Sequence, residues 1–393
     1  MDKNVKDNTL PFVLNCYSQW AIARVFEPLK VAHAMREQII AQFSSEDTRT
    51  RTILIANVMD MFAKNLVIDS TRRSILDRLV LDVRKSGSDF MASPPSFAPK
   101  SDNEIAMRTL DSMLEIFSLQ TTTQPIATCI RSLDYAAPVF RRACPEPPGQ
   151  PVNLPNILLA PNPNLRHFAT IDVVKSITTG TPTYFKYEVP FSLELCERMY
   201  QLQGNLGLQW LHGFPDQFIL LFAWINSLCE TPGASTDSKL IAWIETNLPR
   251  IEVAIDQSGD PLLRIGRMVV QECWRCVVLI YLYMALCKAD AYDHRVVCAQ
   301  KSFMRLIRSV KAGRNPDAYL FTPVTIAGVA TIEDRDRETL RHRILNVREC
   351  AEHGTTGNDF MLMLEDIWAR SRGEGRAAVW SDLRVAYFRV VGK

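Results

Sequence analysis

The chain has 393 residues, enough for one large domain or two ordinary ones. Hydrophobic residues make up 47% and charged residues 22%, which excludes a disordered, collagen-like or low-complexity chain. The 45 Lys and Arg residues nearly balance the 43 Asp and Glu residues. The resulting net charge of +2 gives no global field that would draw the chain onto nucleic acid or an anionic membrane.

Helical periodicity dominates the first 144 residues, where apolar side chains recur at the three-four spacing of one buried helical face. Cap residues and prolines mark where these helices begin and end. The pattern predicts helices over 50–68, from a cap at Ser70 or Thr71 to a stop near Gly87, from Asp102 onward, and from Pro125 to about Cys144.

Seven prolines lie between Pro145 and Pro163, a density that predicts a linker or surface loop without a helix. Residues 178–190 are the one stretch rich in β-forming residues. Two prolines within that stretch restrict it to an edge strand or an extended loop.

Helices are predicted again after Phe191. They span from Pro215 to just before Pro232, then 240–255, 262–287, 295–310, a shorter element bracketed by Pro316 and Pro323, 333–348 and 360–369. Strands and helices do not alternate, so the expected fold is all-α, a multi-helix array of packed helical hairpins. We expect an N-terminal helical layer over 1–144, a Pro-rich linker or loop over 145–163, and a C-terminal helical domain over 164–393.

The most apolar stretch, Val277–Cys287, is shorter than the about 20 residues that span a bilayer. The N-terminus lacks the apolar core of a signal peptide. The ten cysteines follow no disulfide framework, and Cys196, Cys229, Cys287 and Cys298 lie in apolar segments. We therefore expect buried free thiols and a soluble intracellular protein without a membrane partner.

Cys273 and Cys276 form a CxxC, which is half of a zinc site or a redox pair in some proteins. No second CxxC and no histidine pair at zinc-finger spacing accompany it. Since the motif lies in the middle of an apolar helix, core cysteines on either side of Trp274 are the favoured interpretation.

Three acidic clusters are present: Asp290 with Asp293, Glu333-Asp334 with Asp336, and Glu365-Asp366. In an all-α fold, such clusters suggest a metal-dependent enzyme of the isoprenoid-cyclase type, but the chain has no DDxxD sequence. Arg and His residues separate the acids, which favours a salt-paired surface. In particular, residues 334–337 predict a solvated helix face that pairs with itself.

His212 could act as an acid or base, but no nucleophile is near it in the sequence, and a turn histidine is favoured. Phosphate-binding glycine loops and the GxSxG motif are lacking. We assign no catalytic, cofactor-binding or metal-binding residue and no cofactor. Trp224, Trp243, Trp274, Tyr281 and Tyr283 lie on apolar helices, where they form core or, as the alternative, line a ligand pocket.

Several segments resemble the regulatory domain of fungal-specific transcription factors, the helical region that follows a zinc binuclear cluster. The segments are Leu211–Asp216, Gln271–Tyr283, Phe321–Gly328, Phe360–Trp368 and Val379-Trp380, and Tyr17–Pro28 is similar to basidiomycete members. Each also has a structural interpretation. Glu272 and Arg275, three residues apart, predict a semi-buried ion pair, and Ile326-Ala327-Gly328 predicts close helix packing.

The resemblance implies a transcription-regulatory and interaction module in the nucleus, with the cytoplasm as the alternative location. Its implied partners are the transcription machinery or a DNA-binding protein, and a small-molecule effector is a further implied ligand. The six-cysteine pattern of the zinc cluster does not occur in this sequence, so we expect no direct DNA binding from this chain. The alternatives are the isoprenoid-cyclase type of enzyme and a cytosolic helical scaffold.

Overall fold

The computed structural model describes residues 8–43, 45–64, 70–94, 99–202, 207–253 and 260–392, without the side chains of residues 47, 70–72 and 99–101. The regular secondary structure of these residues is helical except for one pair of two-residue strands, which confirms the predicted all-α array of packed hairpins. The chain divides into two compact units. Unit 1 comprises Met1–Ala143 with Trp210–His212 and Gly354–Thr356, and unit 2 comprises the remainder.

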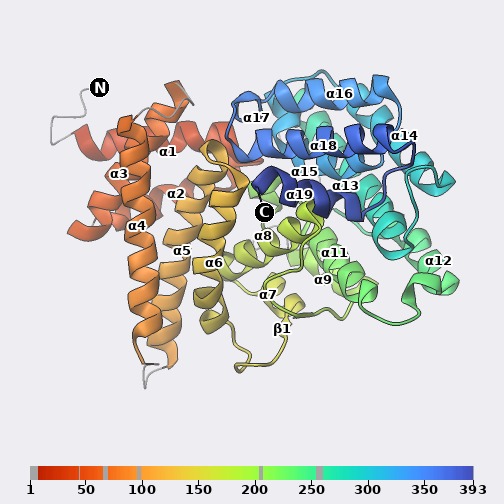
Figure 1. Cartoon of the computed structure of the whole chain (residues 1–393). Helices are drawn as coiled ribbons and strands as arrows, with labels where there is room; N and C mark the ends of the chain where they lie inside the picture. Colours follow the sequence, from red (N-terminus) through yellow and green to blue (C-terminus); the bar gives the residue numbers. More distant parts are fainter. Residues whose placement is uncertain are drawn as a thin grey trace. The chain divides into compact units, whose positions relative to one another are not determined.

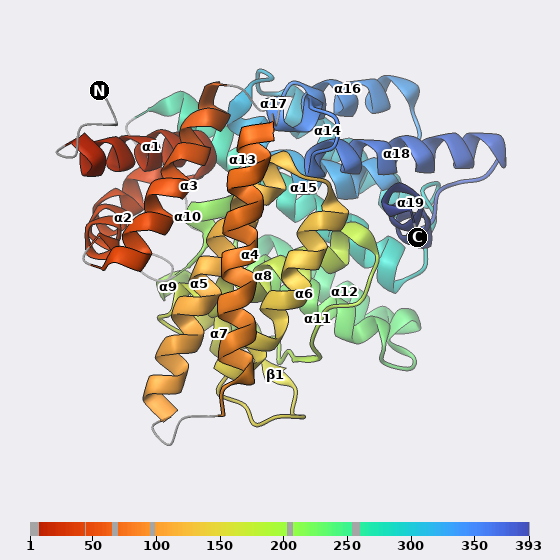
Figure 2. The same ribbon diagram turned by 60° about the vertical axis from the view of Figure 1, so that its left-hand side comes forward.

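Six helices lie within the first 143 residues of unit 1, in the part of the chain that the structure describes. They are α1 (Thr9–Arg24), α2 (Pro28–Gln42), α3 (Glu46–Lys64), α4 (Ser70–Ala92), α5 (Pro99–Thr123) and α6 (Ile126–Ala143). Long α4, α5 and α6 pack against one another, and α1 packs on α3 (Figures 1 and 2). The helices predicted over 50–68, from Asp102 and from Pro125 correspond to α3, α5 and α6. The predicted cap at Ser70 or Thr71 lies outside the described side chains.

Gly87 does not end α4, contrary to the sequence prediction, because the helix continues to Ala92. A Cβ atom built on Gly87 would lie 2.6 Å from Cε of Met113 on α5. The glycine therefore permits close packing of two helices and is not a helix stop. Asp102 is likewise not the first residue of α5, because the helix begins at Pro99. The Asp102 carboxylate forms an ion pair with Arg142 of α6 at 2.6 Å.

The Pro-rich segment contains regular structure, so the prediction that it holds no helix was wrong. Val152-Asn153 forms β1, and Leu154–Leu159 forms helix α7. The prolines Pro155 and Pro163 occupy the first turns of α7 and α8, where a missing N–H costs nothing. β1 pairs in parallel with β2 (Tyr187-Glu188), which lies within the stretch predicted as an edge strand or extended loop.

Helix α8 (Pro163–Thr179) was not among the predicted helices. Asn162 caps its start by accepting a hydrogen bond from the Asn164 N–H at 2.8 Å, and Gly180 ends it with a positive φ of 65°. The helix is buried on most sides, so polar and apolar residues do not separate into two faces. A helix with that environment gives no amphipathic signal in the sequence.

The other elements of the C-terminal part follow α8 and β2. They are α9 (Leu193–Leu202), α10 (Gln209–His212), α11 (Asp216–Cys229), η2 (Ala234–Thr236), α12 (Ser238–Asn247), η3 (Leu248–Arg250), α13 (Pro261–Tyr281), the π-helical η4 (Leu282–Leu286), α14 (His294–Arg308), α15 (Arg314–Val329), α16 (Asp334–Leu345), α17 (Arg348–Ala351), α18 (Thr356–Gly373) and α19 (Ser381–Val391). Central α13 packs against α11, α14 and α15 (Figure 1).

Two predicted boundaries in unit 2 were wrong. The helix expected over 240–255 ends at Asn247, where Pro249 follows in a short 3-10 turn. Pro323 does not bound an element, because it lies inside α15. Its buried position lets packing offset the backbone hydrogen bond that a proline removes.

Helix α13 and η4 together form a 26-residue apolar segment, longer than the stretch predicted from the sequence. By length and composition it could span a membrane, but 78% of its most apolar window is buried inside the protein. The core helix of a soluble protein has the same properties.

Candidate functional site

The aromatic residues of α11 and α13 form a buried cluster in unit 2. The ring of Phe214 stacks on Trp274 with centroids 3.7 Å apart, and Phe222 meets both Trp274 and Tyr281 edge-to-face. Trp274 is 2% exposed. The core interpretation is therefore confirmed for Trp274 and Tyr281, as it is for buried Tyr283.

A second aromatic group is only partly covered. Phe191 stacks on Trp224 with centroids 4.8 Å apart, and Trp243 of α12 meets both rings edge-to-face. Trp243 is 38% exposed, so the core interpretation does not hold for it.

The CxxC cysteines lie on consecutive turns in the middle of α13, as predicted. Cys273 is buried and Cys276 is half-buried. Burial raises the pKa of both thiols, to about 12 for Cys276. Neutral thiols of this kind are poor nucleophiles and poor metal ligands. The buried-thiol prediction was wrong for Cys229 and Cys298, which are exposed.

The first acidic cluster serves local structure at the start of α14. Asp293 caps the helix by accepting from the Arg295 N–H at 2.9 Å, and it also forms an ion pair with the Arg295 guanidinium at 3.0 Å. Asp290 accepts from the Tyr292 N–H at 2.8 Å. The two carboxylates are thus held by neighbouring residues in the turn.

The prediction that residues 334–337 form a solvated helix face that pairs with itself holds only in part for Asp334 and was wrong for Asp336. Asp334 pairs with Arg337 on its own helix at 3.3 Å, but also with Arg372 of α18 at 2.6 Å. Asp336 is instead buried, and it accepts hydrogen bonds from Gln300 at 3.2 Å and Arg308 at 2.6 Å, both on α14. Its side chain faces the neighbouring helix, so alternating charges in the sequence do not imply that all of them reach solvent.

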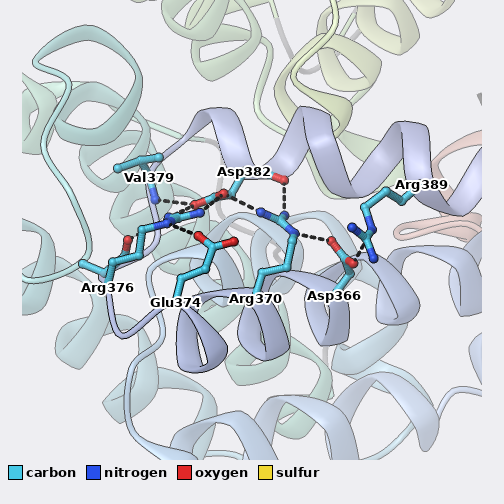
Figure 3. Close-up of polar contacts among 8 residues, drawn as sticks. Asp366, Arg370, Glu374, Arg376, Val379, Asp382 and Arg389 are labelled. Carbon is cyan, nitrogen blue, oxygen red and sulfur yellow. Dashed lines mark hydrogen bonds and ion pairs between the residues drawn. The ribbon is translucent and has the colours of Figure 1, made fainter.

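An ion-pair network joins α18 to α19 (Figure 3). Asp382 of α19 accepts from Arg370 at 2.6 Å and from Arg376 at 2.6 and 2.7 Å, and the Val379 N–H donates to it at 2.9 Å. Asp366, of the third acidic cluster, pairs with Arg370 at 2.7 Å and with Arg389 at 2.8 Å.

Opposing effects set the pKa of Asp382. Burial acts to raise it, but hydrogen bonds from Arg376, the Val379 N–H and Arg370 outweigh burial and lower the pKa to about 2. Asp382 is therefore ionised at any physiological pH, and it holds the start of α19 against the end of α18. The Asp366–Arg370 pair has helical i,i+4 spacing that the sequence reveals, whereas the partners of Asp382 come from three-dimensional contact alone.

Arg343 and Asp317 form a second, fully buried ion pair that sequence reasoning missed. The pair measures 2.6 Å, and the two side chains are 6% and 1% exposed. Arg343 also donates to the carbonyls of Ile307 and Val310, at the end of α14. The pair thus joins α14, α15 and α16, and breaking it would leave one buried charge unpaired.

The remaining residues singled out in the sequence have structural environments. Glu272 and Arg275 form the expected pair at 3.3 Å, with Arg275 mostly buried. A Cβ atom on Gly328 would lie 2.7 Å from Leu364, which confirms close packing of α15 on α18. His212 ends α10, and burial lowers its pKa to about 4, so the imidazole is neutral at pH 7.

The ion pairs and close contacts described above hold helices together. Among the described residues, no three His, Cys, Asp or Glu side chains are grouped so as to hold a metal ion. Exposed apolar side chains do gather on one helix face: Leu262, Ile265 and Met268 of α13 are 81%, 49% and 43% exposed. Their spacing of three residues places them along one stripe.

Comparison with known proteins yields one match. The family model described as the fungal specific transcription factor domain matches residues 161–386. No curated protein and no solved structure matches the chain. Since the matched region covers more than half of the sequence and includes the aromatic cluster, the Arg343–Asp317 pair and α13, the chain belongs to the family with the fungal-specific transcription factor domain.

Proposed function

We propose that this chain is a transcription-regulatory and interaction module that works in the nucleus through partners. The match of residues 161–386 to the family carries the proposal. The sequence lacks the six-cysteine pattern of the zinc cluster, and its net charge is +2, so DNA contact falls to a partner protein. The module has no catalytic role in this proposal, because Asp293 caps a helix and both Glu365 and Asp366 pair with arginine.

The proposed domain division is an N-terminal helical layer over 1–144, a connecting segment over 145–163, and the regulatory domain over 164–393. In this division the family match lies almost wholly within the third part. The network of Asp382 and the Arg343–Asp317 pair stabilise that part, which supports its role as a rigid body that presents a surface to other proteins.

The apolar stripe of α13 gives the interaction role a specific test. The chain would be fused to a bacterial repressor's DNA-binding domain and assayed on a reporter that carries the matching operator. We expect reporter output to differ from that of the DNA-binding domain alone. Replacing Leu262, Ile265 and Met268 by Ser should abolish the difference, because the substitutions remove apolar surface that a bound partner would bury. The matched control replaces Leu362 and Val385, which are 46% and 45% exposed on other helices, by Ser.

Two outcomes would contradict the proposal. Reporter output equal to that of the DNA-binding domain alone would remove the regulatory role. A specific band shift of a promoter fragment by the purified chain, at physiological salt and without a partner, would show direct DNA binding. Microscopy of a tagged chain tests the location, and a cytoplasmic signal under all growth conditions would favour a cytosolic scaffold.

A further inference from the structure

Tyr292 carries the most exposed aromatic side chain of the described residues, at 63% exposure against 47% for Tyr135. It lies in the turn between η4 and α14, where the Asp293 N–H donates to the Asp290 carbonyl at 3.2 Å. The Asp290 side chain accepts from the Tyr292 N–H at 2.8 Å and fixes the same turn. Tyr135 instead lies inside helix α6. An enzyme that binds its substrate as an extended chain can therefore reach the Tyr292 hydroxyl without unwinding a helix.

The turn that holds Tyr292 lies beside two helix ends that carry arginines. The Ala291 N–H donates to the Ala378 carbonyl at 2.9 Å, which joins the turn to the segment that follows α18. Arg372 is in the last turn of α18. Arg337, near the start of α16, interacts electrostatically with the Tyr292 hydroxyl. A charged group added to this hydroxyl would therefore lie within electrostatic range of a guanidinium.

The two arginines share one carboxylate. Asp334 pairs with Arg372 at 2.6 Å and with Arg337 at 3.3 Å, so this group of three side chains has a net charge of about +1. Burial lowers the pKa of Arg337, and the like charge of Arg372 lowers it further. The Arg372 side chain is 68% exposed, so it can turn toward a new anion without leaving a buried position. The group therefore attracts an additional negative charge.

We propose that Tyr292 is a phosphorylation site and that its phosphate group binds Arg337 and Arg372. The phosphate oxygens match the N–H geometry of guanidinium groups. Asp293, the acid that follows Tyr292, is already paired with Arg295 at 3.0 Å. The phosphate would hold the turn against the ends of α16 and α18. This modification goes beyond the proposed role in transcription and does not depend on it.

The phosphoryl group comes from a nucleoside triphosphate bound to a protein kinase. The bond between Oη of Tyr292 and the γ-phosphorus forms, and the bond from that phosphorus to the β,γ-bridging oxygen breaks. The nucleoside diphosphate leaves, and the phenol proton passes to the catalytic base of the kinase.

The catalytic domain of a tyrosine kinase with ATP is the probe for access to Tyr292. It would be incubated with the purified full chain and with a peptide of residues 286–298, in which Tyr292 is the one tyrosine. Mass spectrometry would count and locate the phosphoryl groups. We expect one phosphoryl group at Tyr292 of the folded chain. Tyr292→Phe should abolish this modification, and Tyr135→Phe, the matched control, should keep it.

Phosphorus NMR of the modified chain tests the arginine contacts. The second pKa of a phosphate monoester is ordinarily about 6. Nearby positive charge favours the doubly charged form, so this pKa should be lower in the folded chain than in the phosphorylated peptide. Arg372→Gln and Arg337→Gln should each raise the pKa toward the value of the peptide. Arg305→Gln is the control, because Arg305 lies about 17 Å along α14 from the start of that helix, farther than the Debye length at physiological salt.

The kinase is chosen for its activity on the peptide, so a failure on the folded chain reports a lack of access. The proposal is overturned if the kinase modifies the peptide but not Tyr292 of the folded chain, or if the phosphate titrates alike in the wild type and in Arg372→Gln. A failed reporter assay together with modification of Tyr292 would refute the transcription role alone. A working reporter without this modification would refute the phosphorylation site alone.

Discussion

Replacing Asp382 by Asn should destabilise the protein by about 2 kcal/mol at pH 7. The substitution keeps the size of the side chain and removes the charge that Arg370 and Arg376 bind (Figure 3). The pKa of Asp382 is lowered from 3.8 to about 2, and each pKa unit corresponds to about 1.36 kcal/mol. This stabilisation is present above the unfolded-state pKa and is lost as the pH falls through the folded-state pKa.

Urea unfolding of the wild type and of Asp382→Asn at pH 7, 5 and 3 measures this contribution. The difference in unfolding free energy should stay near about 2 kcal/mol between pH 7 and 5 and narrow to about 1 kcal/mol at pH 3. Glu374→Gln is the control, because Glu374 is 51% exposed and contacts Arg376 at the surface, where an ion pair contributes about 0–1 kcal/mol. A difference that does not change with pH, or a control effect as large as that of Asp382→Asn, would refute the reasoning.

Three further predictions concern packing, pH and the CxxC. Gly328→Ala should lower the free energy of unfolding by about 1–3 kcal/mol, because the added Cβ would overlap Leu364. Gly373→Ala is the control, since its Cβ would meet open space and should lower the free energy of unfolding less. Urea unfolding measures both. Burial raises the pKa of Glu115 from 4.5 to about 7. The folded protein therefore favours the protonated carboxyl, and the free energy of unfolding falls as the pH rises from 4.5 through 7. Glu115→Gln should therefore be more stable than the wild type at pH 8, and lower stability there would contradict this. Cys273→Ser should lower the Tm and leave the zinc content, measured by mass spectrometry, unchanged; loss of stoichiometric zinc would show a metal site.

Amphipathic helices were predictable from the sequence, because periodicity reports which face of a helix is buried. The helices α3 and α14 were recognised on this basis. Helix α8 was not, because it is surrounded by protein and carries buried polar residues such as Arg166 and Asp172. Prolines in the connecting segment were interpreted as helix breakers although Pro155 occupies a first helical turn, where proline is well accommodated.

Ion pairs within one helix could be predicted from the sequence, whereas ion pairs between helices could not. Pairs three or four residues apart, such as Glu272 with Arg275, are visible in the sequence. The pair of Arg343 with Asp317 joins residues on different helices, and no spacing rule connects them.

The side chain of Arg275 acts as a non-covalent cross-link between two helical elements. Its guanidinium donates to the carbonyl of Leu248 and, at 3.2 Å, to that of Ile251, so the end of η3 is tied to the middle of α13. Both bonds must break before the end of η3 can move away from α13. The motions of the two elements are therefore coupled, although Ile251 and Arg275 are 24 residues apart in the sequence.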